Sequence, residues 1–429
     1  MMFLLIAIFL LVRLFVAIRR RYRQNQSMLF FHPFCDCGGG GERVLWVAIQ
    51  GVLRLRSDVD ISIASASEKT PNDIFNAVET QFGLNFSDKE RARVAFLKVR
   101  FANAMSQTYW SSMAILGQNS AALISLFFTL AGTFFTAVPD IFVDTTGFPL
   151  TLILVWLLGT SKVVAYVHYP AMTPRILEIT SISFLKSMYY RLFLALYRMS
   201  GAVCAVVIAN SRWTEERLRL SWDRPDSVVL YPPVALNSFK PGNFKRENAV
   251  VSLGQFRPEK NHALQLLTFA RLKAMKSACT KFWVIGGARD AADLERVETL
   301  RRLATQLGLD VDFVVNASRA EIEKRLLSAK CAIHTMQDEH FGISILEFMA
   351  AGLPVVAHKS GGPEKDIIPK DMRLGFLATD AEEFANCIDK AIRGYDNLEI
   401  TEMVSRAKSS LDRFLDDEAF GDRFARLAV

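Results

Sequence analysis

The sequence of 429 residues predicts an α/β protein with two doubly wound domains, each built on a parallel sheet. Three observations support this prediction. Short apolar runs alternate with longer stretches that carry charges on one side, as strands and helices do. A polar segment at 237–246, which contains Pro241 and Gly242, separates two series of this kind. The length suits two domains of ordinary size.

The first series occupies residues 28–236. Its apolar runs predict strands at 28–34, 59–64, 94–99, 140–144, 163–167 and 203–209, with a helix at 42–55 directly after the first strand. Such alternation implies a parallel sheet with helices on both faces. Loops that contain glycine, histidine or asparagine follow several of these strands.

The second series occupies residues 247–429. It predicts strands at 249–253, 281–285, 312–315, 331–335 and 355–357, with charged helices between them. We expect the two domains to face each other across a cleft, with ligands at the carboxyl ends of the strands. The last helix is a candidate to return to the first domain.

Residues 1–24 predict a membrane anchor. The run 1–18 is apolar except for Arg13, and arginines follow at positions 19, 20, 21 and 23. Eighteen residues lie near the lower limit for a membrane span. The basic flank on the C-terminal side predicts that the rest of the chain lies in the cytoplasm. No small-residue cleavage site follows, which disfavours a cleaved signal peptide.

A second apolar region lies at about 111–158, where 121–138 and 148–158 are nearly free of charge. Two interpretations are open. The region can form a pair of buried helices packed on the sheet, or a helix in the membrane interface that presents a lipid acceptor. A second full span is disfavoured, because it would put the halves of one domain on opposite sides of the membrane.

Composition narrows the class of ligand and the compartment. The net charge of +7 suits an anionic substrate or an anionic membrane surface. We find no nucleic-acid-binding motif and no long basic tract, which disfavours nucleic acid as a partner. The six cysteines form no C-x-x-C pair, so we expect reduced thiols in a cytosolic domain.

The segment EHFGISILE at 339–347 carries the most functional information. Glu339 and Glu347 flank a loop of His340, Phe341 and Gly342 and the start of a predicted helix. Free N–H groups at a helix N-terminus suit a diphosphate, and a carboxylate can accept hydrogen bonds from two neighbouring hydroxyls. These groups together suit a sugar nucleotide. The spacing alone favours the alternative, in which both glutamates are solvated residues that stabilise the helix dipole.

Two further loops contain groups that bind anions. Residues 38–41 are four consecutive glycines at the start of a helix, where backbone N–H groups can approach a phosphate closely. Arg257 and Lys260 follow the first strand of the second domain and can neutralise a diphosphate. The alternatives are a flexible glycine loop and ordinary ion pairs of both cations with Glu259.

His168 ends the strand in AYVHYP, although a lone histidine is more often a structural residue than a catalyst. Two Asp-x-Asp pairs, 58–60 and 310–312, have the letters of a metal-binding motif. Both stand at the beginnings of strands, which is the wrong end for a ligand site in this fold class. We therefore expect no metal.

The segment EHFGISILE resembles the E-x7-E region of the retaining family-four glycosyltransferases with the GT-B fold. Three other segments are FFHPFCDCGGGGERVLW at 30–46, ANSRWTEE at 209–216 and SLGQFRPEKNH at 252–262. Together they resemble a family of alpha-1,2-mannosyltransferases of the endoplasmic reticulum that extend the dolichol-linked N-glycan precursor. The likeness extends from about Phe30 to the last helix.

This resemblance implies retaining transfer of mannose, as the fourth and fifth residues, from GDP-mannose to a dolichol-diphosphate-linked oligosaccharide. It implies that no metal or other cofactor is needed. The catalytic domains would lie on the cytoplasmic face of the endoplasmic-reticulum membrane, with other early-pathway mannosyltransferases as candidate partners. The alternatives are another lipid- or sterol-directed GT-B transferase, or a catalytically silent scaffold subunit.

The resemblance also assigns roles to individual residues. It implies catalytic roles for Glu339, His168, Arg257 and Lys260, where Glu339 contacts the mannose and the two cations contact the diphosphate. Glu347 would bind the ribose. The remaining donor-binding positions are Gly342, Phe341, Ile343, Gly361 and Gly362. The phosphate or acceptor loop is formed by Gly38, Gly39, Gly40 and Gly41.

Overall fold

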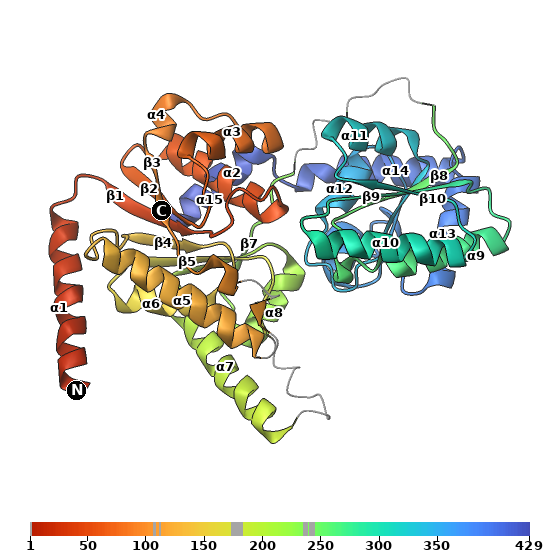
Figure 1. The fold of residues 1–429 in the computed structure, drawn as a ribbon. Helices are drawn as coiled ribbons and strands as arrows, with labels where there is room; N and C mark the ends of the chain where they lie inside the picture. The colour runs from red at the N-terminus through yellow and green to blue at the C-terminus, as the bar shows by residue number, and fades with distance from the viewer. Residues whose placement is uncertain (1, 106–108, 111–112, 173–182, 235–238, 240–244) are drawn as a thin grey trace. The chain divides into compact units, whose positions relative to one another are not determined.

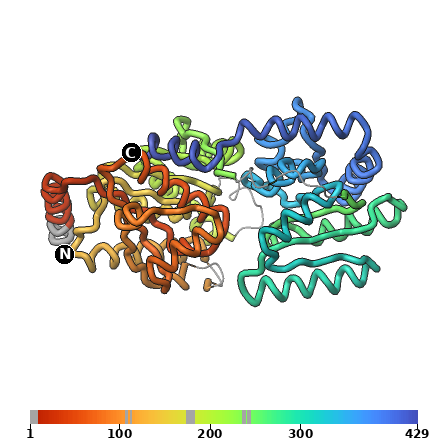
Figure 2. Tube along the Cα trace, turned by 90° about the horizontal axis from the view of Figure 1, so that it is seen from above, coloured from red at the N-terminus to blue at the C-terminus, as the bar shows by residue number. Residues whose placement is uncertain are grey.

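The structure is a computed structural model that describes residues 2–105, 109–110, 113–172, 183–234, 239 and 245–429, without the side chains of residues 2–8. The chain divides into two compact units (Figures 1 and 2). Unit 1 contains residues 1–233 and 417–429, and unit 2 contains residues 234–416. Most of the predicted linker at 237–246 lies outside the described residues.

Unit 1 is built on a parallel sheet of seven strands in the order β3-β2-β1-β4-β5-β6-β7. The strand order reverses between β1 and β4, as in doubly wound folds that bind ligands at this point. The strands are β1 (Gln26–Phe31), β2 (Val59–Ser65), β3 (Val94–Lys98), β4 (Ile141–Asp144), β5 (Lys162–Val167), β6 (Val206–Ala209) and β7 (Val228–Val229).

Helices cover both faces of this sheet, so the strands are buried on both sides and read as continuous apolar runs (Figure 1). One face carries α2 (Gly40–Leu55), α3 (Pro71–Phe82) and α15 (Asp417–Ala428); the other carries α5 (Ala114–Gly132), α6 (Pro149–Leu157) and α7 (Phe184–Ala202). The unit also contains α1 (Met2–Arg21), α4 (Asp88–Arg91) and α8 (Arg212–Trp222).

The final helix, α15, belongs to unit 1 although it follows unit 2 in the sequence. It crosses α2 at two glycines, where a Cβ added at Gly51 would lie 2.2 Å from the backbone of Gly421. The Phe424 ring stacks on Phe30 of β1 with centroids 6.1 Å apart. Small residues at the crossing therefore let the aromatic residues of α15 reach the sheet.

The predicted anchor forms one continuous helix, α1, whose last turn is tied to unit 1. Arg20 binds Asp140 at 2.5 Å and the carbonyl oxygen of Gly159 at 2.7 Å. Val16 is buried in the core of unit 1. The outer side of the helix exposes large apolar side chains: Leu10, Leu11, Leu14, Phe15 and Ile18.

The apolar region at 111–158 forms α5, β4 and α6, apart from 111–112, which lie outside the described residues. Leu126 and Leu130 of α5 are fully buried in the core, as the interpretation with helices packed on the sheet requires. The other side of α5 exposes Phe128 by 56%. The helix α5 has the length and apolarity of a membrane span, and 39% of its most apolar stretch is buried.

Unit 2 is built on a parallel sheet of six strands in the order β10-β9-β8-β11-β12-β13, which reverses between β8 and β11. Its strands are β8 (Ala249–Leu253), β9 (Lys281–Gly286), β10 (Val311–Val315), β11 (Cys331–His334), β12 (Val355–His358) and β13 (Phe376–Ala378). Its α-helices are α9 (His262–Ala274), α10 (Ala291–Gln306), α11 (Arg319–Ser328), α12 (Ile343–Ala350), α13 (Ala381–Arg393) and α14 (Leu398–Ser409).

The structure contains two strands that were not predicted, and one predicted strand begins later than expected. The edge strands β7 and β13 were not predicted, because two or three residues are too few to show a period. The strand predicted at 203–209 begins only at Val206, since α7 continues to Ala202. The apolar last turn of a helix and the start of a buried strand look alike in sequence.

Cys35, Cys204, Cys279, Cys331 and Cys387 are free thiols. Cys35, Cys204 and Cys331 are buried, whereas Cys37 is exposed. Burial raises the pKa of Cys35 to about 12, so this thiol stays protonated and unreactive at neutral pH.

Candidate functional site

The two strands at which the order of the unit 2 sheet reverses carry the central pair of charges. Lys260 ends the short 3-10 helix η5 (Pro258–Lys260) that follows β8, and Glu339 lies in the loop that follows β11. The Lys260 Nζ is 2.5 Å from Oε2 of Glu339. Glu339 is 8% exposed. It is therefore a buried, paired carboxylate, which contradicts the alternative that it is solvated.

Glu339 also lies close to a histidine that the sequence interpretation missed. His334, the last residue of β11, is 4% exposed, and its Nε2 is 3.0 Å from Oε2 of Glu339. The other carboxylate oxygen accepts a hydrogen bond from the backbone N–H of His340 at 3.1 Å. Burial opposes ionisation of Glu339, but the charge of Lys260 and the contact with His334 hold its pKa well below the usual value.

This depressed pKa has a consequence for stability. The ionised Glu339 stabilises the fold at every pH above the pKa of an unfolded glutamate. That contribution is lost as the pH falls through the lower folded pKa.

Lys260 is positioned through its backbone. The Thr335 hydroxyl donates to the carbonyl oxygen of Lys260 at 2.9 Å and accepts from Nε2 of Gln265 at 3.0 Å. Gln265 and Thr335 are both nearly fully buried. These hydrogen bonds connect α9, β11 and η5, and they orient Lys260 towards Glu339.

Gly361 and Gly362 shape the loop that carries Glu339. The N–H of Gly362 donates to the carbonyl oxygen of Glu339 at 2.8 Å. Gly361 has φ +69°, and a Cβ there would lie 2.3 Å from the same carbonyl oxygen. Side chains at these positions would push the Glu339 loop away. The two glycines therefore support the site through backbone packing, besides any contact with a donor.

Gly342 and its neighbours set the start of α12. Gly342 is the N-cap with φ 109° and ψ 57°, a left-handed conformation that favours glycine. Ile343 is the first residue of α12. Phe341 is buried, and its ring packs edge-on against Phe414 with centroids 5.6 Å apart. The loop between Glu339 and α12 is thus held by the N-cap at Gly342 and by the packing of Phe341 on Phe414.

Glu347, in the second turn of α12, is paired with an arginine that the sequence interpretation did not find. Nη1 of Arg319, the first residue of α11, is 2.6 Å from Oε1 of Glu347. The same guanidinium contacts Glu323 and lies 5.1 Å from the centroid of the Phe239 ring. Only 15% of the Glu347 side chain is exposed, so the solvated interpretation is wrong for this residue also.

Arg257 has a different environment from Lys260. It is the N-cap of η5, and its Nη1 is 3.5 Å from Glu259. Its side chain is 37% exposed. The alternative interpretation paired both cations with Glu259, and the structure shows this pairing for Arg257 but places Lys260 on Glu339. A role of Arg257 towards a diphosphate stays a prediction.

In unit 1 the glycine loop and His168 are brought together. Gly38 has φ +76°, and α2 begins at Gly40. The N–H of Gly39 donates to Oε2 of Glu42 at 2.7 Å. A Cβ at Gly41 would lie 3.6 Å from Nε2 of His168, which follows β5. The loop and the histidine therefore share the carboxyl edge of the first sheet.

Four further side chains at this edge were not predicted. Nδ1 of His32, which follows β1, is 2.7 Å from Oγ1 of Thr145, which follows β4. Glu42 lies 3.5 Å from the other ring nitrogen of His32. Asp144 is fully buried, which raises its pKa although it accepts hydrogen bonds from three N–H groups of the loop that follows β4. No local sequence signal joins these residues, because they come from different strands.

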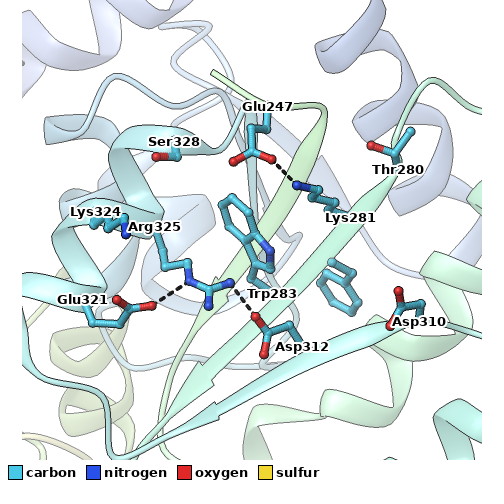
Figure 3. Close-up of a pocket in the computed structure, with 11 residues that line it drawn as sticks. Glu247, Thr280, Lys281, Trp283, Asp310, Asp312, Glu321, Lys324, Arg325 and Ser328 are labelled. Carbon is cyan, nitrogen blue, oxygen red and sulfur yellow. Dashed lines mark hydrogen bonds and ion pairs between the residues drawn. The ribbon is translucent and has the colours of Figure 1, made fainter. Parts of the chain in front are cut away.

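A cavity of about 420 Å³ lies at the opposite end of the unit 2 sheet (Figure 3). Asp310 and Asp312 line it beside the amino end of β10. Arg325 pairs with Asp312 and Glu321 across its floor. This Asp-x-Asp pair therefore lies far from the carboxyl edge. Within the described part of the chain, no three histidine, cysteine or acidic residues form a group that could hold a metal ion.

Two protein families match the chain in succession. Residues 25–222 match the family described as ALG11 mannosyltransferase N-terminus. Residues 234–408 match the family described as Glycosyl transferases group 1. The first match corresponds to most of unit 1, and the second to most of unit 2.

Characterised relatives match nearly the whole length. The chain is 32% identical to the GDP-Man:Man(3)GlcNAc(2)-PP-Dol alpha-1,2-mannosyltransferase of Xenopus tropicalis, over 96% of this chain and 91% of the relative. It is 32% identical to the protein of the same name from Homo sapiens, over 92% of this chain and 85% of the relative.

Solved structures have the same fold. Anabaena Alr3699/HepE in complex with UDP superimposes with a TM-score of 0.64 at 18% identity, covering 94% of this chain and 98% of that chain. Sucrose-phosphate synthase from Thermosynechococcus elongatus superimposes with a TM-score of 0.68 at 16% identity and the same coverage. The predicted GT-B class, with two Rossmann-like domains, is confirmed at the level of the fold.

Proposed function

This chain belongs to the family of GDP-Man:Man(3)GlcNAc(2)-PP-Dol alpha-1,2-mannosyltransferases, and we propose that it transfers mannose from GDP-mannose to a dolichol-diphosphate-linked oligosaccharide. The products are the dolichol-diphosphate-linked oligosaccharides to which a fourth and a fifth mannose have been added. One observation carries the proposal. A buried acid–base pair, Glu339 and Lys260, stands where the sheet order reverses, in a chain that matches these relatives over 96% of its length.

The chemistry at this edge suits departure of a nucleoside diphosphate. Negative charge develops on the diphosphate as the bond to mannose breaks, and Lys260 with Arg257 supplies positive charge there. The free N–H groups at the start of α12 add partial positive charge at the same place. Glu347 accepts hydrogen bonds from the ribose diol, and Glu339 from hydroxyls of the mannose.

The assignment of the unit 1 residues follows from their place on the first sheet. His168 and the loop 38–41 share its carboxyl edge, where a doubly wound domain binds its ligand. We assign the loop to a phosphate or acceptor and His168 to the transferred sugar. Among the described residues at either edge we assign none as a nucleophile, so we propose front-face transfer with retention.

A transfer assay tests the proposed function. The purified chain, given GDP-mannose and the trimannosyl dolichol-diphosphate acceptor, yields the pentamannosyl lipid, whose two new residues are released by an alpha-1,2-mannosidase. Cations of the protein serve the diphosphate in this proposal, so we expect activity to persist in excess EDTA. Absence of the pentamannosyl product contradicts the named activity. A requirement for Mn²⁺ or Mg²⁺ contradicts the metal-independent mechanism, and transfer only to another lipid or a sterol supports the alternative enzyme.

We propose that unit 1 also rests on the endoplasmic-reticulum membrane. The helices α1 and α7 both extend from unit 1 towards the bottom of Figure 1, and α5 and α6 lie between them. Large apolar side chains are exposed on all four helices, for example Ile18, Phe128, Trp156, Leu185 and Met188. Exposed apolar side chains on several helices of one unit, with arginines in the same unit, suit contact with an anionic bilayer. The lipid acceptor would then be reached from the same membrane.

Acidic substitutions on α5 test this membrane contact. Phe127 and Phe128 are 39% and 56% exposed, so we expect their replacement with aspartate to leave the fold and GDP binding intact. Binding to liposomes and use of the lipid acceptor should fall, because charge in the bilayer interface is unfavourable. Leu294 and Leu398 of unit 2, 51% and 73% exposed, are the control pair. Loss of GDP binding in the α5 variant would show that these residues are structural.

The proposed orientation places both units in the cytoplasm. The chain contains Asn-x-Ser sequences at Asn25, Asn85 and Asn316, which become glycan acceptors only in the lumen. Asn85 is exposed, so it would accept a glycan if the unit were luminal. Protection of both units from protease in sealed microsomes, or a glycan on Asn85, would contradict the orientation.

Replacing Arg319 with glutamine tests the nucleotide role of Glu347. Arg319 binds Glu347 at 2.6 Å, and its loss removes a charge-assisted hydrogen bond that orients the carboxylate. We expect GDP to bind about 10-fold more weakly, which corresponds to about 1.4 kcal/mol. Glu347→Gln should show a similar loss, and the two effects should not add, because both variants break one interaction.

Arg325→Gln is the matched control. Arg325 lies on the same helix and makes the same kind of ion pairs, with Asp312 and Glu321, at the amino edge of the sheet. We expect its GDP affinity to equal that of the parent protein, as measured by calorimetry. Unchanged affinity in both Arg319→Gln and Glu347→Gln would exclude the ribose role.

A further inference from the structure

One carboxylate oxygen in unit 2 has two basic neighbours. Oε2 of Glu339 is 2.5 Å from Nζ of Lys260 and 3.0 Å from Nε2 of His334. Although His334 is close, its ring is not aligned for a hydrogen bond to this oxygen, and Nδ1 has no hydrogen-bond partner within the described residues. The histidine is thus next to the ion pair without completing it.

The residues around His334 are mostly buried, which limits how many of them can carry a charge. His334 is 4% exposed, and the titratable groups that face it are Glu339, Lys260, His262 of α9 and His358 at the end of β12. Burial lowers the pKa of His262 to about 4 and also lowers that of His358. His340, next to Glu339, is also buried, and burial lowers its pKa. The ion pair of Lys260 with Glu339 is therefore the main charged contact of this cluster.

Donor binding disturbs this balance if the proposed function holds. The diphosphate of GDP-mannose carries two negative charges, and Lys260 is one of the two cations assigned to it. A lysine that moves towards the diphosphate leaves Glu339 buried without its strongest partner. An unpaired buried carboxylate is unfavourable, so a second cation must replace Lys260 or the carboxylate must take up a proton.

We propose that His334 takes a proton from solvent when the donor draws Lys260 away, and that the resulting imidazolium keeps Glu339 ionised and oriented towards the mannose. The proton adds to the ring nitrogen facing Oε2 of Glu339, and no bond to the sugar is involved. His334 is therefore a positioning residue, which acts through Glu339. Binding of the donor is coupled to uptake of a proton.

Calorimetry measures this coupling directly. GDP-mannose is titrated into the full chain at pH 7.5 in buffers with different enthalpies of ionisation, and the dependence of the heat on the buffer gives the protons taken up. We expect on the order of one proton for the parent protein and none for His334→Asn. The donor affinity of the parent should weaken as pH rises from 7 to 9, and that of His334→Asn should stay flat.

A second buried histidine provides the control. His262 is also buried in α9 but does not contact Glu339, so His262→Asn should keep the proton uptake. Uptake that persists in His334→Asn would overturn the proposal and assign the proton to Glu339 itself. A parent protein that binds GDP-mannose with no uptake and no dependence on pH would overturn it as well.

A measurement without donor separates this inference from the proposed function. Replacing Lys260 with methionine imitates departure of the lysine. We expect the NMR signals of the His334 ring at pH 7 to show a neutral ring in the parent and a protonated ring in Lys260→Met. The same state in both proteins overturns the inference, whether or not mannose is transferred. Absence of GDP-mannose binding and transfer, with the expected ring signals, would overturn only the proposed function.

Discussion

Replacing Lys260 with methionine should weaken binding of GDP and GDP-mannose by about 10- to 100-fold, and transfer should fall further. Both ligands carry the diphosphate, and a hydrogen bond to a charged group contributes about 1.5–3 kcal/mol. Transfer loses more, because the charge on the diphosphate grows as the bond to mannose breaks. Binding is measured by calorimetry and transfer by conversion of the trimannosyl lipid. Membrane binding should be unchanged.

Lys281→Met is the matched control for this experiment. Lys281 pairs with Glu247 at the amino end of the same sheet, and its side chain is 54% exposed. An exposed pair of this kind contributes little to stability, and nothing at that end contacts the proposed donor site. We expect parent-like affinity and activity. Equal GDP affinity in Lys260→Met and the parent would refute the assignment of Lys260 to the diphosphate.

Replacing Gly51 with valine should strongly destabilise unit 1. A Cβ at Gly51 would lie 2.2 Å from the backbone carbonyl of Gly421, and neither backbone can move without separating α2 from α15. Overpacking of this severity costs about 3 kcal/mol or more. For a unit of this size the midpoint of thermal unfolding should fall by about 6–12 °C. The measurement is thermal unfolding followed by circular dichroism.

Gly132→Ala is the control for this variant. Gly132 ends α5, has no atom within 4 Å of an added Cβ and does not have a left-handed φ. We expect its unfolding midpoint to stay close to that of the parent. An unchanged midpoint in Gly51→Val would show that α15 does not pack on α2 in solution. The C-terminal helix would then be dispensable for unit 1, and removal of 417–429 should also be tolerated.

Two ion pairs lie at the proposed donor site, Lys260 with Glu339 and Arg319 with Glu347. The sequence did not predict either pairing. Glu339, Glu347 and Lys260 were singled out as candidates from their positions together with the family resemblance. Their partners were not recognised. Lys260 is 79 residues from Glu339 in sequence, and Arg319 is 28 residues from Glu347. No periodic pattern connects residues so far apart. In the sequence, Glu259 was the nearer candidate partner for Arg257 and Lys260.

The sequence by itself determined the features that depend on neighbouring residues. Apolar runs between polar turns placed eleven of the strands of the two sheets, because burial of a parallel strand on both faces requires a continuous apolar segment. Gly342 and Gly361 were recognisable as loop glycines, and the structure shows the left-handed φ that favours them. The family followed from the same local motifs.

The tertiary structure alone decided which distant groups meet. It placed α15 on α2, His334 beside Glu339 and Arg319 beside Glu347. The physical reason is that these contacts arise where strands and helices from separate parts of the chain end at one edge of a sheet. Local spacing specifies that edge, but the packing of the whole unit selects the partners, since buried charges are stable only where packing supplies an opposite charge.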